Sequence, residues 1–265
     1  VAPAAAEASP EESIEAPPRE RPRNAPLPPA RRGSFLPKFL VLILLLAAGG
    51  FRIEKGVADL ETVVDASSMA RFPLFAHSQG AAIGIAYAAR HPERVSHLIL
   101  LGGWSRSVMK RNLTTAQIEE MRTLVKLAGF GWGRENPSYR QVFTSLLIPD
   151  STAEQAASYN ELERMCTPPE CAARILSSVG KLDVMDLAPL VQCPTLVMHA
   201  QGDASVPYEE GRLIAGAIPS ARFVLLHGRN HILLPHEVAW KEFFAELRAF
   251  LGESGLAALS GRENE

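Results

Sequence analysis

This chain of 265 residues has few cysteines and no large excess of acidic or basic residues. The three cysteines, Cys166, Cys171 and Cys193, are too few and too irregularly spaced for a disulfide framework. No paired histidines stand near them to complete a zinc site. The formal net charge is only −2, which argues against a surface for nucleic acid. We therefore predict no metal site, no other cofactor and no nucleic-acid partner.

A long hydrophobic run is also missing. The most hydrophobic run, residues 39–51, has thirteen uncharged residues between Lys38 and Arg52. A membrane-spanning helix needs about twenty, so this run is short for one. Before it, residues 1–38 contain nine of the twenty prolines together with much alanine, glutamate and arginine. That composition is typical of a disordered tail.

The remainder of the chain has the size of one globular domain. About 225 residues follow the tail, which is enough for one sizeable core. An apolar content of 47% supports a globular body. The chain opens with valine rather than methionine, which is consistent with a fragment or with an alternative start codon translated literally.

The pentapeptide Ala76-His77-Ser78-Gln79-Gly80 joins an apolar run, residues 71–75, to an alanine-rich segment that is predicted to be helical up to Arg90. A serine on such a sharp strand-to-helix turn is strained, so its neighbours two residues away are expected to be nearly free of side chain. Ala76 and Gly80 meet that requirement. Taken alone the pattern is weak, because a helix N-cap serine would look the same.

Two further polar residues follow predicted strands. Asp203 comes just after a buried strand over residues 193–200, and His231 follows another over residues 221–226. A helix is predicted between them, over residues 208–217. The order Ser78, Asp203, His231, each beyond the carboxyl end of a different strand, is the order expected of an α/β-hydrolase triad.

Three segments carry a more specific resemblance: residues 91–103, 203–207 and 228–234, which read HPERVSHLILLGG, DASVP and GRNHILL. They resemble the α/β-hydrolase superfamily, and are most similar to hydrolase-like modules found alone or fused to bacterial nucleotide cyclases and transcriptional regulators. The resemblance covers roughly residues 52–251. It implies an α/β fold with a mostly parallel sheet flanked by helices and a helical cap after the sixth strand.

The same resemblance implies roles for the polar residues. Ser78 would be the nucleophile, His231 the general base and Asp203 the acid that orients it, with Asp186 and Glu209 as substitutes for Asp203. The backbone N–H of Gln79 would stabilise the oxyanion at a helix N-terminus.

The usual loop that donates a second oxyanion N–H is not recognisable, since no histidine precedes His77. The apolar run 39–51 therefore has three interpretations. It is a core strand whose end, Ala48-Gly49-Gly50, replaces that loop, or a short membrane anchor or signal-like segment. In the third, a truncated or rearranged gene leaves the sheet incomplete at its amino-terminal side.

The region between Gly103 and Asp183 is almost wholly helical in pattern and is predicted to form the cap, at about residues 104–183. Four helices are expected there, over residues 114–128, 137–147, 152–165 and 169–179. The aromatic residues Phe130, Trp132, Phe143 and Tyr159 are pocket candidates, although we favour a role in holding the cap helices together. The domain is expected to end at residue 253, before a flexible tail, residues 254–265.

Two functions from different classes follow. The first is a cytoplasmic serine hydrolase that cleaves an ester or similar small acyl substrate through an acyl-enzyme. The second is a non-catalytic sensory or interaction module of the same fold, membrane-tethered through residues 39–51. The complete Ser-Asp-His set favours the first, and the missing amino-terminal strands favour the second. The oligomeric state is not predicted.

Overall fold

The computed structural model describes residues 52–67 and 69–260. The predicted disordered tail, the apolar run 39–51 and the glycines proposed as an oxyanion loop lie outside these residues. Within the described part of the chain, no helix is both long enough and apolar enough to cross a membrane.

A parallel sheet forms the centre of the fold. Its strands are β1 (Phe72–His77), β2 (Val95–Leu101), β3 (Thr195–Ala200) and β4 (Ala221–Leu226), which lie side by side in chain order. Every residue of β3 is buried, as expected of a strand covered on both faces. Because all four strands run in one direction, their carboxyl ends meet at one edge of the sheet.

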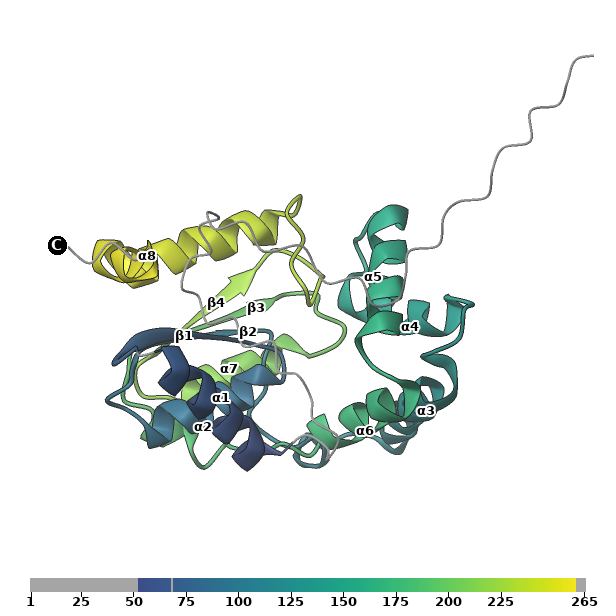
Figure 1. Ribbon diagram of the computed structural model, residues 1–265, viewed down its shortest axis with the longest axis horizontal. Coiled ribbons are helices and arrows are strands. Elements are labelled where there is room, and N and C mark those ends of the chain that lie inside the picture. The colour runs from purple at the N-terminus through teal and green to yellow at the C-terminus, as the bar shows by residue number, and fades with distance from the viewer. Residues whose placement is uncertain (1–51, 68, 261–265) are drawn as a thin grey trace, which may run out of the picture. The chain divides into compact units, whose positions relative to one another are not determined.

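Helices cover both faces of this sheet (Figure 1). One face packs against α1 (Ile53–Ser67), α2 (Gly80–Arg90) and α7 (Tyr208–Ala217). On α1 the buried side chains of Val57, Leu60 and Val64 follow helical spacing and form the face of the helix that packs on the core. The parallel sheet with helices on both faces agrees with the predicted fold class.

The opposite face packs against α8 (Val238–Ser260). Buried Phe243, Leu247 and Leu251 from this helix join the core residues of the sheet. Helical structure continues to Ser260 beyond a break at Gly252, next to the predicted domain boundary at residue 253. Gly252 has a φ of 61°, which glycine adopts without the strain that a side chain would cause.

The cap gathers beyond the carboxyl ends of the strands (Figure 1). Its helices are α3 (Thr115–Gly131), α4 (Ser138–Leu147), α5 (Ala153–Cys166) and α6 (Pro169–Val179), so all four predicted helices are confirmed. Both α3 and α5 begin with a capping box, in which a threonine and a glutamine exchange side-chain-to-backbone hydrogen bonds. Two short 3₁₀ helices, η1 (Val108–Lys110) and η2 (Ala188–Leu190), are also present in the described residues.

The aromatic residues of the cap mostly pack within it. Trp132 and Phe143 meet edge to face with ring centroids 5.2 Å apart, and the Trp132 indole donates to the Glu163 carbonyl at 2.7 Å. Phe130 is half exposed and packs against Tyr139. For Trp132 and Phe143, these contacts agree with the favoured interpretation that they hold the cap helices together.

A buried polar cluster joins α4 to α5. The Thr144 hydroxyl lies 2.9 Å from Asn160 Oδ1 and 3.2 Å from Glu163 Oε2, and the buried Arg140 side chain donates to the Asn160 carbonyl at 2.7 Å. Burial raises the pKa of Glu163 to about 7, although the Thr144 hydrogen bond and the charge of Arg140 oppose that shift. The cap therefore contains a carboxyl group that stays protonated in mildly acidic solution.

This carboxyl group makes stability depend on pH. The folded protein keeps a proton on Glu163 that the unfolded chain loses near its ordinary pKa of 4.5, so the contribution is full below that pH and is lost as pH rises through 7. We expect Glu163→Gln to raise the free energy of unfolding by about 2–3 kcal/mol at pH 8, and by much less at pH 5. Urea denaturation at both pH values measures this. The exposed Glu161→Gln is the control, and an equal gain at both pH values for Glu163→Gln would contradict the assignment.

Candidate active site

The turn after β1 presents Ser78 in a strained conformation. Ser78 has a φ of 56°, in the left-handed region that side chains rarely adopt. Its N–H donates to the Leu101 carbonyl on β2 at 2.9 Å, and its own carbonyl accepts from the Ala81 N–H at 3.0 Å. Strand and helix thus hold the serine from both sides, as the pentapeptide predicted for a sharp strand-to-helix turn.

Gly80 is not the most crowded glycine near this turn. A methyl group added there would lie 3.9 Å from the Ala76 Cβ, which is an ordinary contact. The close approach lies instead at Gly103, where an added Cβ would be 2.2 Å from the Ala81 Cβ. The helix after the serine therefore packs against the chain that leaves β2.

Asp203 lies in the loop after β3 and is buried. Its Oδ1 accepts from the N–H groups of Ser205 and Val206, both at 2.9 Å. Burial alone would raise the pKa of this carboxyl, but hydrogen bonds with His199, His231 and the Val206 amide outweigh it and hold the pKa well below its usual range. The side chain is therefore a carboxylate at neutral pH, with Oδ2 directed away from its own loop.

His231, in the loop after β4, lies between the other two residues. Its Nδ1 is 2.6 Å from Asp203 Oδ2, and its Nε2 is 2.8 Å from Ser78 Oγ. Because an ionised carboxylate only accepts hydrogen bonds, Nδ1 carries the proton and Nε2 presents its lone pair to the serine hydroxyl. The structure thus brings Ser78, His231 and Asp203 together, and it is Asp203 rather than Asp186 or Glu209 that contacts the imidazole.

Gly102, at the end of β2, lies against this histidine. It has a φ of 59°, and an added Cβ would be 3.1 Å from His231 Cε1 and 3.2 Å from Nδ1. Both the backbone conformation and the close approach therefore favour glycine here. This contact was not predictable from the sequence, because the two residues are far apart along the chain.

Two other histidines support the site. His77 Nε2 lies 3.0 Å from the His231 carbonyl oxygen, and burial together with the neighbouring His231 ring lowers the pKa of His77 to about 4. The neutral His77 ring therefore donates to that carbonyl. His199 is fully buried on β3, with its Nε2 2.9 Å from the Val206 carbonyl oxygen and 3.4 Å from Asp203 Oδ2. The sequence placed His199 correctly on a strand but carried no signal for its contact with the carboxylate.

Gln79 stands at the N-terminus of α2 with helical φ and ψ. Its backbone N–H has no hydrogen-bond partner among residues 52–67 and 69–260. A free N–H at the positive end of a helix is suited to stabilise an oxyanion next to Ser78. One of the three interpretations of residues 39–51 placed a second donor in residues 48–50, which lie outside the described part of the chain.

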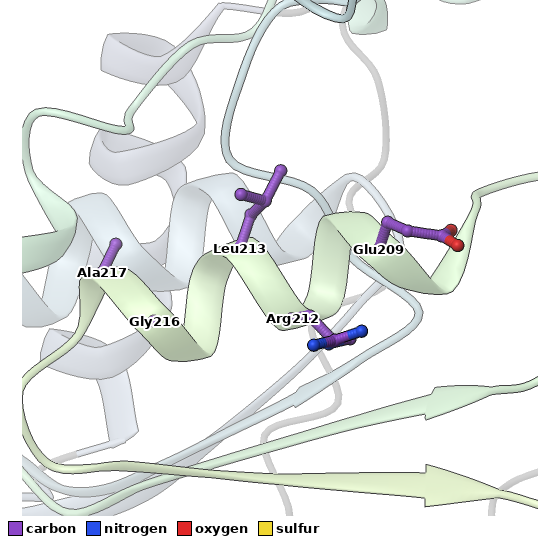
Figure 2. A pocket seen from close by; sticks show the side chains of 5 residues that line it. All are labelled: Glu209, Arg212, Leu213, Gly216 and Ala217. Atoms are coloured by element: carbon purple, nitrogen blue, oxygen red, sulfur yellow. The ribbon is translucent and has the colours of Figure 1, made fainter.

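A separate hollow of about 600 Å³ lies along α7 (Figure 2). Its described lining comes from this helix alone and consists of Glu209, Arg212, Leu213, Gly216 and Ala217. It contains none of the three residues assembled around His231.

The amino-acid sequence is similar to those of known hydrolases. The family model described as the alpha/beta hydrolase fold matches residues 28–237. A putative carbamate hydrolase, RutD from Klebsiella pneumoniae, is 28% identical over 184 residues, which cover 69% of this chain and 67% of RutD. For the RutD of a second Klebsiella pneumoniae strain, the matched region covers 64% of the protein.

Solved structures agree in fold. The enol-lactonase from Burkholderia xenovorans superposes with a TM-score of 0.61 at 22% identity, covering 76% of this chain and 74% of that one. A thermophilic esterase from Thermogutta terrifontis gives a TM-score of 0.60 at 23% identity, covering 78% and 74%.

Proposed function

The chain belongs to the α/β hydrolase fold family, and we propose that it is a serine hydrolase that cleaves a small acyl substrate through an acyl-enzyme. The observation that carries this proposal is the continuous hydrogen-bonded path from Ser78 Oγ through His231 to Asp203. A serine hydroxyl is a poor nucleophile at neutral pH, and an adjacent imidazole oriented by a carboxylate activates it.

The first half of the reaction follows from these positions. As Ser78 Oγ bonds to the acyl carbon, His231 Nε2 takes the hydroxyl proton, and Asp203 stabilises the imidazolium that forms. The carbonyl oxygen becomes negative next to the Gln79 N–H. When the tetrahedral intermediate collapses, the bond to the leaving group breaks, and His231 returns the proton to that group.

Water completes the cycle. His231 takes a proton from a water molecule as its oxygen attacks the acyl-enzyme, and the proton then returns to Ser78 Oγ as the acid is released. The relatives bear names for the cleavage of carbamates, esters and enol-lactones, all of which carry an acyl carbon bonded to oxygen or nitrogen. Small substrates of this class, with an activated leaving group, are therefore the first to test.

The decisive experiment is labelling with a fluorophosphonate probe, which reacts with activated serines. We expect rapid labelling of the wild type and none of Ser78→Ala, while Ser138→Ala, which changes an exposed serine on the cap, labels like the wild type. Mass mapping of the labelled peptide identifies the modified residue. A folded wild-type protein that does not label would overturn the hydrolase mechanism and favour the alternative of a non-catalytic binding module.

A further inference from the structure

The backbone of His231 is held at both of its polar groups. Its N–H donates to the Leu147 carbonyl at the end of α4 at 2.9 Å, and the Ile232 N–H donates to the same oxygen at 3.1 Å. On the other side, its carbonyl accepts from His77 Nε2. His77 belongs to the sheet, and Leu147 belongs to the cap.

Asn230 fastens the cap side of this arrangement. Its side chain is fully buried, and Oδ1 accepts from the Asp150 N–H at 2.9 Å. The cap turn 147–150 is therefore bound at its first carbonyl by His231 and at its last amide by the neighbouring Asn230. An ion pair between Arg229 and Asp150, at 3.0 Å, spans the same two segments on the exposed surface.

The two ends of this buried amide differ in their hydrogen bonds. Its Nδ2 is buried and has no hydrogen-bond partner in the described part of the chain. A buried amide nitrogen without a partner costs about 1–3 kcal/mol, a cost that an apolar side chain of similar size would avoid. What an apolar side chain cannot supply is an acceptor for the Asp150 N–H.

We propose that Asn230 is a positioning residue for the general base. By fixing the turn 147–150, it keeps the Leu147 carbonyl where the His231 N–H needs it, and so keeps the imidazole within hydrogen-bonding distance of Ser78. The inference rests on the proposed function. Since a displacement of about 1 Å in a reacting group costs about 10²-fold in rate, a modest shift of this loop has a large effect on kcat.

The test compares two near-isosteric substitutions. Asn230→Leu removes the acceptor, whereas Asn230→Asp keeps an oxygen for the Asp150 N–H. With p-nitrophenyl acetate as substrate, we expect Asn230→Leu to lower kcat by about 10- to 100-fold with little change in KM. Asn230→Asp is expected to recover most of that loss. Arg229→Gln, which breaks only the exposed ion pair, is the matched control and is expected to retain wild-type kcat.

Unfolding midpoints in urea show whether a lower kcat comes from a displaced histidine or from unfolded protein. If Asn230→Leu does not fold, Asn230→Ala is used in its place. A loss that appears in KM or only in the folded fraction, or an aspartate variant as slow as the leucine variant, would overturn the inference. So would a leucine variant with wild-type kcat in an active enzyme. A wild type that neither hydrolyses the ester nor reacts with the fluorophosphonate would instead overturn the proposed function, and this inference with it.

Discussion

Replacing His231 with glutamine is expected to lower kcat for ester hydrolysis by about 10⁶-fold while KM changes little. Glutamine keeps polar atoms in the pocket but has no nitrogen that accepts the serine proton. In the wild type, Nε2 lies 2.8 Å from Ser78 Oγ and is the only imidazole nitrogen that faces it in the described structure. Without that acceptor, attack on the substrate would need an unassisted hydroxyl. Steady-state kinetics with p-nitrophenyl acetate measures the loss.

A matched histidine provides the control. His227 is exposed, and its Nδ1 lies 2.6 Å from Glu242 Oε1 on α8. His227→Gln is expected to leave kcat and KM as in the wild type. Comparable losses in the two variants would show that His231 is not the general base.

Replacing Asp203 with asparagine is expected to lower kcat by about 10⁴-fold, through the tautomer of His231. The Ser205 and Val206 N–H groups both donate to Oδ1, so the asparagine would place its carbonyl oxygen there. Its NH₂ would then occupy the Oδ2 position and donate to His231 Nδ1. That arrangement forces the proton onto Nε2, where it blocks transfer from Ser78.

The two carboxylates considered as substitutes serve as controls for this variant. Asp186→Asn and Glu209→Gln are expected to have wild-type kcat, because neither side chain contacts His231 in the described structure. Urea denaturation distinguishes a tautomer effect from unfolding, since a correctly folded Asp203→Asn keeps the unfolding midpoint of the wild type. If Asp186→Asn were the inactive variant, the assignment of Asp203 as the carboxylate that orients His231 would be wrong.

The fold was predictable because its signals are local. Strand β3 is a continuous apolar run bounded by turn residues, and α7 and β4 follow it with the residue limits that their patterns predicted. Parallel strands then place whatever follows them at one edge, which is why the chain order of Ser78, Asp203 and His231 indicated a single site.

The supporting contacts were not predictable because they join distant segments. His77 reaches a carbonyl 154 residues away, and the Asp150 N–H reaches Asn230 across 80 residues. Neither contact leaves a periodic pattern or a motif in one sequence. The close approach of Gly103 to Ala81 was not predictable for a related reason. Which neighbour crowds α2 depends on how the chain leaves β2, and that path is set by packing rather than by the pentapeptide.

The glycines after β2 have a consequence for mutational scanning. An activity screen would report Gly102 and Gly103 as intolerant of every substitution, with scores close to those of the residues that react. Neither contributes an atom to the chemistry, because Gly102 gives room to the His231 ring and Gly103 gives room to the Ala81 methyl group. Screening the same library for abundance as well as turnover would separate these two positions from Ser78, whose alanine variant is expected to accumulate normally while being inactive.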